Sequence, residues 1–167
     1  MLPSLYVAAS TPAYVDTRII DEDVEPVDFN TDADLIGISF MTYNAPRAYE
    51  IADQFRAQGK TVFFGGYHPS FMKEEAIRHA DSICLGEAER NMPRMIEDYR
   101  ADRLEPFYKS ELVNLDSLPA LNRSLINKKA YFITNVLQAT RGCHHRCTFC
   151  SVAPFNEYTL RNRPIGK

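Results

Sequence analysis

The chain has 167 residues, of which 45% are hydrophobic and 25% are charged, and its formal net charge is −3. This length suffices for one full domain and part of a second. The weak negative charge indicates no bulk attraction to nucleic acid or to an anionic membrane. No run of about 18 apolar residues occurs, so we expect no membrane span. The N-terminus also lacks the basic region of a signal peptide.

The first half of the chain alternates between strand and helix patterns. Thr17–Ile20 is a short candidate strand, and Leu35–Phe40 is a nearly continuous apolar run, which is typical of a strand buried on both faces. Pro46 fits only the first turn of the helix that should follow, and Gly59 would end that helix. Its apolar side chains recur at helical spacing on one face: Ala48, Ile51, Ala52 and Phe55.

The same alternation continues through the next segment. Thr61–Phe64 is a strand that runs into Gly65-Gly66, a short helix follows near Lys73–His79, and Ser82–Leu85 is another strand. A further helix carries one apolar face: Ala88, Met92, Met95, Ile96 and Tyr99. Strands that alternate with helices predict βαβ units and a parallel sheet with right-handed crossovers. We therefore expect an α/β domain with a doubly wound parallel sheet, Rossmann-like or flavodoxin-like, over residues 1–104.

The remaining chain has a different character. Prolines interrupt residues 105–136, which we interpret as a linker with one short strand at Phe107–Lys109. Ile133–Gln138 is then a strand that leads into a cysteine-rich loop, so residues 137–167 form a separate third part.

Three of the four cysteines lie within eight residues, as Cys143-x3-Cys147-x2-Cys150 in the segment TRGCHHRCTFCSV. Such clustering suits metal binding in a reducing compartment better than a disulfide framework, so we expect a cytoplasmic protein. Three thiolates on a tight loop can hold three irons of a [4Fe–4S] cluster and leave the fourth iron open.

Zinc is the alternative ligand for this loop. Structural zinc sites usually have four ligands, often from C-x2-C pairs, and the spacing here fits that arrangement poorly. His144 or His145 could complete a zinc site, although a residue next to a ligand is badly placed to reach the same metal. Cys84 lies at the end of a predicted core strand, where a lone cysteine is more often a small buried hydrophobe.

The cysteine motif resembles the C-x3-C-x-Φ-C signature of radical S-adenosylmethionine (SAM) enzymes, in which Φ is aromatic and is Phe149 here. The resemblance implies that SAM binds the open iron through its amino and carboxylate groups. An electron, supplied by a donor such as flavodoxin or ferredoxin, then cleaves SAM to a 5′-deoxyadenosyl radical. Phe149 would lie near the adenine of SAM. The alternative is that Phe149 is simply a core aromatic.

The front domain resembles the cobalamin (B12)-binding domain that precedes the barrel in many radical SAM enzymes. The matching stretches are DADLIGISFMTYNAPRAYEIADQF, VFFGGYHPSF and ADSICLGEAERNMPRMIEDY. Ligands of open parallel sheets bind outside the carboxyl ends of the strands, and the resemblance implies cobalamin contacts there: Ser39, Met41, Thr42, Gly65, Gly66, Tyr67, His68, Gly86 and Glu87. The serine and the paired glycines would line the pocket for the nucleotide tail.

Each of these residues also has a purely structural interpretation. Ser39 could cap a local backbone group, and Gly65-Gly66 could be only a turn. His68 could be a surface turn residue, and Glu87 could be a first-turn helix acid favoured by the helix dipole.

The chain departs from the family in three respects. The D-x-H-x-x-G motif, whose histidine binds cobalt in some B12 proteins, is absent, so we expect no histidine of this chain on cobalt. The usual opening strand of the domain also has no counterpart. Only 17 residues follow Cys150, and Arg161-Asn162-Arg163 resembles the R-x-R segment after the cluster loop, so we expect only the first element of the barrel.

The sequence therefore predicts the N-terminal part of a cobalamin-dependent radical SAM enzyme that performs radical-based methylation or carbon-skeleton chemistry and is inactive as this fragment. Two alternatives remain open. One is a cobalamin-binding or nucleotide-binding module with a structural zinc site, and the other is a radical SAM protein whose front domain has lost B12.

Overall fold

The computed structural model describes residues 2–133 and 135–164. The chain divides into two compact units, one made of Met1–Val27 with Leu112–Lys167 and the other of Asp28–Glu111. No helix among the described residues is long and apolar enough to cross a membrane.

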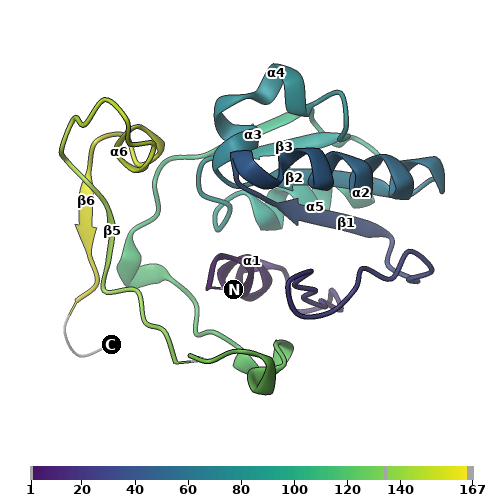
Figure 1. The fold of residues 1–167 in the computed structure, drawn as a ribbon, viewed down its shortest axis with the longest axis horizontal. Helices are drawn as coiled ribbons and strands as arrows, with labels where there is room; N and C mark the ends of the chain where they lie inside the picture. The colour runs from purple at the N-terminus through teal and green to yellow at the C-terminus, as the bar shows by residue number, and fades with distance from the viewer. Residues whose placement is uncertain (1, 134, 165–167) are drawn as a thin grey trace. The chain divides into compact units, whose positions relative to one another are not determined.

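The Asp28–Glu111 unit is a four-stranded parallel sheet with helices (Figure 1). The strand order is β1-β2-β3-β4, with β1 at Leu35–Ser39, β2 at Thr61–Gly65, β3 at Ser82–Leu85 and β4 at Phe107–Lys109. The connections contain the 3-10 turn η1 (Thr42–Asn44), α2 (Ala45–Ala57), α3 (Tyr67–Phe71), α4 (Lys73–Ala76) and α5 (Met92–Arg100). The α/β prediction with a parallel sheet is confirmed. The strand order does not reverse among these strands, so the doubly wound arrangement stays a prediction.

Helix α2 covers β1 and β2 on one face of the sheet. Figure 1 shows α2 running along β1 and β2, with which it is in contact. Val62 and Phe64 of β2 are fully buried, whereas Phe63 between them is only partly buried. The predicted apolar face of α2 is buried as expected: Ala48, Ile51, Ala52 and Phe55. Gly59, at φ 79°, ends that helix in the left-handed region that glycine tolerates best.

Helix α5 packs against β4, which is the edge strand at the opposite end of the sheet from β1. Met92, Met95 and Ile96 of α5 are buried, but the helix begins at Met92, so Ala88 lies before it. Tyr108 of β4 is completely buried and donates a hydrogen bond of 2.9 Å to the Asp98 carboxylate of α5.

Four secondary-structure predictions were wrong in part. Leu35–Phe40 does contain β1, but β1 is an edge strand and is not buried on both faces. Phe107–Lys109, expected within a linker, is instead the fourth strand of the sheet. Thr17–Ile20 forms no strand, because no strand of the described chain pairs with it. The described residues of Ile133–Gln138 form none either, and residue 134 lies outside the described residues.

The other unit combines the first residues of the chain with its last part. Its elements are α1 (Leu2–Ser10), the 3-10 turns η2 (Leu115–Ser117), η3 (Arg123–Leu125) and η4 (Lys128–Ala130), β5 (Thr140–Gly142), α6 (Val152–Phe155) and β6 (Leu160–Asn162). Tyr6 of α1 packs in a buried cluster with Val113, Leu115 and Leu118. Strands β5 and β6 form an antiparallel pair around the cysteine loop (Figure 1).

Candidate cofactor-binding edge and cysteine loop

The loops that follow β1 and β2 are joined at the carboxyl edge of the sheet. Ser39 and Gly65 are register partners at the ends of the two strands. The Phe40 N–H donates to the Gly65 carbonyl at 3.2 Å, and the His68 N–H donates to the Phe40 carbonyl at 3.4 Å. The edge thus brings together residues that the sequence analysis assigned to one site, while Ser39, Met41 and Thr42 remain exposed there.

The two glycines after β2 differ physically. A Cβ on Gly65 would meet no atom within 4 Å, so open space lies beside this strand end. Gly66 has φ 98° and ψ −172°, a conformation essentially restricted to glycine. A Cβ there would lie 2.8 Å from the Phe40 carbonyl oxygen. Gly65 therefore leaves room for a ligand, whereas Gly66 is required by the backbone itself.

Ser70 of α3 fixes the positions of two loops at this edge. Its hydroxyl donates to the Gly66 carbonyl at 2.7 Å and accepts from the Gly86 N–H at 3.0 Å. The link holds the segment after β2 next to the segment after β3. The sequence did not predict the role of Ser70, because a serine beside a proline carries no signal of a bridging role.

A chain of polar side chains runs inward from the same edge. His68 is only 6% exposed, so it is not a surface turn residue. Its Nδ1 lies 3.2 Å from Thr42 Oγ1 and its Nε2 lies 3.0 Å from the Tyr49 hydroxyl. The Tyr49 hydroxyl donates to the Glu75 carboxylate at 3.1 Å. Burial, followed by the bond to Glu75, raises the pKa of Tyr49 to about 12. Tyr49 and Glu75 were not predicted from the sequence to lie at this site.

The loop after β3 is not helical, and its Glu87 and Asn91 side chains are buried. Gly86 has φ 76°, and Glu87 precedes α5 and is only 7% exposed, so Glu87 is not a first-turn helix acid. Cys84 is also buried, and burial raises the pKa of its thiol to about 11. The Asn91 amide donates to Cys84 Sγ at 3.5 Å and to the Glu87 carbonyl at 3.3 Å. Cys84 thus has the environment of a core residue.

The remaining predicted contacts are Met41 and Tyr67. Met41 is 41% exposed just after β1. Tyr67 begins α3 and is partly buried.

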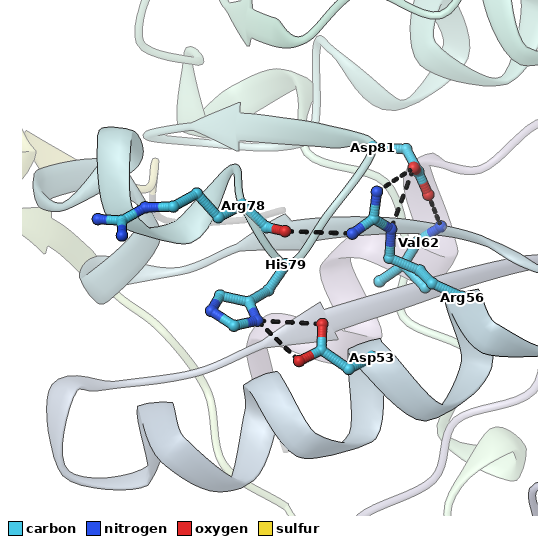
Figure 2. Close-up of polar contacts among 6 residues, drawn as sticks. All are labelled: Asp53, Arg56, Val62, Arg78, His79 and Asp81. Atoms are coloured by element: carbon cyan, nitrogen blue, oxygen red, sulfur yellow. Dashed lines mark hydrogen bonds and ion pairs between the residues drawn. The ribbon is translucent and has the colours of Figure 1, made fainter.

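A separate polar network, shown in Figure 2, lies at the amino ends of the strands, opposite their carboxyl ends. Asp81 accepts from the Val62 N–H at 2.8 Å and from two nitrogens of Arg56, at 3.0 and 3.2 Å. His79 Nδ1 lies 2.9 Å from an Asp53 carboxylate oxygen. These contacts join α2 to the beginnings of β2 and β3, away from the strand ends that carry Gly65 and Gly86.

The three clustered cysteines lie between β5 and α6, and all three thiols are free. Cys147 is exposed, while Cys143 and Cys150 are partly buried. The Cys150 N–H donates to the Cys147 carbonyl at 3.2 Å, which tightens the loop, and the His145 N–H points at Cys143 Sγ at 3.5 Å. Among the described residues, no three His, Cys, Asp or Glu side chains are gathered as a metal site. The donor set suits iron or zinc, but the thiols are not preassembled.

Gly142 and Asn156 shape the base of this loop. Gly142 has φ 92°, and a Cβ on it would lie only 2.1 Å from the Thr159 carbonyl oxygen, so only glycine allows this close approach. The Asn156 side chain accepts from Arg161 at 2.8 Å. Arg161, the first arginine of the R-x-R segment, also donates to the Val113 carbonyl at 2.8 Å. Phe149 is 91% exposed, so it is not a core aromatic.

Comparison with known proteins gives curated relatives that are methyltransferases. Bacteriochlorophyllide d C-8(2)-methyltransferase of Chlorobaculum tepidum is 36% identical over 94% of this chain and 37% of that protein. The C-12(1)-methyltransferase of the same organism, which also acts on bacteriochlorophyllide d, is 32% identical over 96% of this chain and 37% of that protein. The chain thus spans little more than a third of the length of these relatives.

Two further comparisons concern the fold and the family. The N-terminal domain of a hypothetical Thermotoga maritima protein superimposes with a TM-score of 0.46 and 18% identity, over 66% of this chain and 89% of that one. The family model for the B12 binding domain matches residues 2–96, which include β1, β2 and β3 with the loops that follow them. This chain belongs to the B12-binding domain family.

Proposed function

We propose that this chain binds cobalamin at the carboxyl edge of its parallel sheet and is the front part of a radical SAM enzyme that transfers methyl groups. The proposal rests mainly on the family match over residues 2–96. These residues include the carboxyl ends of β1, β2 and β3, where open space lies beside Gly65. Both Chlorobaculum relatives are methyltransferases. Cobalamin, when bound, supplies a cobalt centre that carries a methyl group.

The residues of the edge would each bind or orient the cofactor. Ser39 would offer its exposed hydroxyl, and Gly65 would let the nucleotide tail approach the backbone closely. His68 would not bind cobalt, because both of its ring nitrogens face partners within the protein. The other proposed contacts line the same strand ends: Met41, Thr42, Gly66, Tyr67, Gly86 and Glu87.

The cysteine loop would hold the second cofactor. Cys143, Cys147 and Cys150 would be the three protein ligands of a [4Fe–4S] cluster, and Phe149 would pack against the adenine of SAM. The exposure of Phe149 supports this, because an aromatic ring left in solvent is available to a ligand. An electron donor such as flavodoxin or ferredoxin would reduce the cluster. The proposed organisation is residues 1–104 for cobalamin, together with the strand Phe107–Lys109 that completes the sheet, a linker in the rest of residues 105–136, and residues 137–167 as the beginning of the radical SAM domain.

The test is a titration of the full-length protein with hydroxocobalamin, followed by its visible absorption. Gly65→Ile places a side chain in the open space at the end of β2 and should weaken binding by at least about tenfold, or about 1.4 kcal/mol. Thr61→Ile is the matched control, because it places the same side chain at the other end of the same strand. It should bind like the wild type.

Two outcomes count against the proposal. Equal binding by both variants would place the cofactor elsewhere. Absence of binding by the wild type would favour a front domain that has kept the fold without B12.

A further inference from the structure

Four polar side chains form a continuous hydrogen-bonded chain from the proposed cofactor edge to Glu75 of α4. Thr42 lies exposed at the edge, followed by buried His68, then Tyr49, and finally Glu75, whose side chain is 41% exposed. Successive partners are 3.2, 3.0 and 3.1 Å apart. We call this set the Thr42–Glu75 chain.

The protons in the Thr42–Glu75 chain can be assigned starting from Glu75. A carboxylate only accepts hydrogen bonds, so the single hydroxyl proton of Tyr49 is directed to Glu75. The pKa of Tyr49, raised to about 12, keeps that proton on the phenol. The Tyr49 oxygen must therefore accept from His68, which places a proton on His68 Nε2.

In its neutral form the imidazole carries only one N–H, and with that proton on Nε2 the Nδ1 of His68 is a bare acceptor. The only proton that can fill the 3.2 Å contact to Nδ1 is the hydroxyl proton of Thr42. Thr42 thus directs its proton into the protein and its lone pairs outward. Within the part of the chain that the structure describes, no N–H or O–H group donates to Thr42 Oγ1.

We infer that Thr42 Oγ1 is a fixed hydrogen-bond acceptor that selects a donor group on the cofactor, specifically a primary carboxamide N–H of the corrin periphery. The inference rests on the proposed cobalamin function. A carboxylate at the same place has no proton to donate, so its oxygens would face the lone pairs of Thr42. His68 is a positioning residue, because it acts by orienting Thr42. A site built to pair with an N–H rejects a ligand that lacks it, since the acceptor is then left unsatisfied.

The binding test compares hydroxocobalamin with its monocarboxylic acids, in each of which one peripheral amide has been hydrolysed, on the full-length protein. One acid isomer should bind the wild type about tenfold more weakly than hydroxocobalamin. Thr42→Val, which removes the hydroxyl at nearly constant shape, should abolish that preference, and Thr42→Ser should retain it. Thr61→Val is the matched control at the opposite edge and should keep the wild-type preference.

The outcomes separate this inference from the proposed function. Binding of hydroxocobalamin without any preference among the acids, or a preference that survives in Thr42→Val, overturns the role of Thr42 and leaves cobalamin binding intact. Absence of hydroxocobalamin binding by the wild type overturns both.

A second measurement tests the proton order without a ligand. Nitrogen-15 NMR of the histidine side chains, at a mildly alkaline pH where imidazole is neutral, distinguishes the two tautomers. The signal that disappears in His68→Gln should show the Nε2–H tautomer. Observation of the Nδ1–H form would mean that His68 donates to Thr42, and it would overturn the inference.

Discussion

The adjacent glycines after β2 have opposite physical roles, which changes how the cofactor site can be probed. A bulky side chain at Gly66 looks like a direct test of ligand access when only the sequence is considered. The structure shows that the backbone of Gly66 excludes a side chain even without a ligand, since a Cβ would lie 2.8 Å from the Phe40 oxygen. A loss of binding on substitution of Gly66 would therefore not separate access from folding, and Gly65 is the informative position.

Gly66→Ala should lower the free energy of unfolding by about 1–3 kcal/mol, because its φ of 98° and ψ of −172° are accessible essentially to glycine alone. Gly65→Ala should stay within about 0.5 kcal/mol of the wild type, since its Cβ meets nothing within 4 Å. Urea denaturation of both variants measures the difference. Similar stabilities for the two would show that the loop after β2 relaxes freely around a side chain.

Cys84 should make the stability of the protein depend on alkaline pH. Its thiol pKa rises from 9.0 to about 11 in the folded state, first because of burial. Between these values the thiol ionises in the unfolded chain but not in the folded one, so stability is fully present below about pH 9 and is lost as pH rises toward about 11. The full loss should be about 2–3 kcal/mol, of which about half falls between about pH 8 and about pH 10.

The measurement is urea unfolding at about pH 8 and about pH 10, compared between the wild type and Cys84→Ala. The variant should have a lower starting stability but a smaller decrease with pH. The comparison is needed because Tyr49 and Tyr131 also have raised pKa values, each about 12. Parallel curves for the two proteins would contradict the assignment of this pH dependence to Cys84.

At the scale of elements, the sequence predicted the strands and helices that form the interior of the sheet unit. Ser82–Leu85 was predicted with the bounds of β3, and the apolar face of α2 was predicted residue by residue. These succeed because burial in a parallel sheet demands apolar runs, and a covering helix demands an apolar stripe. Thr17–Ile20 has β-branched residues but no partner strand, and pairing depends on distant parts of the chain.

The candidate site was predictable only in its strand-end residues. Ser39, Gly65 and Gly86 follow from the rule that ligands bind at the carboxyl ends of parallel strands. Tyr49 and Glu75 could not be predicted in this way, because Tyr49 is 19 residues from His68 and 26 residues from Glu75 in the sequence. Their contacts exist only once α2, α3 and α4 have packed together.

The network around Asp81 should stabilise the sheet without affecting the cofactor edge. The Asp81 carboxylate accepts from Arg56 and from the Val62 N–H, and Asp81→Asn replaces one of its oxygens. The free energy of unfolding should therefore fall by about 1–3 kcal/mol. Hydroxocobalamin affinity should not change, since Asp81 lies at the start of β3. Asp102→Asn, at an exposed residue, is the control and should change stability by less than about 0.5 kcal/mol. A weakened affinity in Asp81→Asn at unchanged stability would contradict this separation.

At the scale of the whole molecule, the two proposed sets of cofactor ligands lie on two different compact units. The proposed cobalamin contacts all lie within Asp28–Glu111, and the clustered cysteines lie in the unit that contains Leu112–Lys167. The two sites should therefore lose their cofactors independently when their own residues are changed. Changes at Gly65 should spare metal binding, and changes at the cysteines should spare cobalamin binding.

Anaerobic reconstitution of the full-length protein with iron and sulfide tests the cysteine loop. We expect a broad charge-transfer band and a reducible cluster, because three free thiols on one short loop match three ligands of a cubane. Cys143→Ala, Cys147→Ala and Cys150→Ala should each abolish cluster formation.

Cys84→Ala is the matched control, since its buried thiol is held by Asn91 inside the sheet unit, and it should take up as much iron as the wild type. SAM should also change the electron paramagnetic resonance signal of the reduced wild-type cluster, because three protein ligands leave one iron open. A stoichiometric zinc site without iron uptake would exclude the cluster. A cluster that does not respond to SAM would count against membership of the radical SAM superfamily.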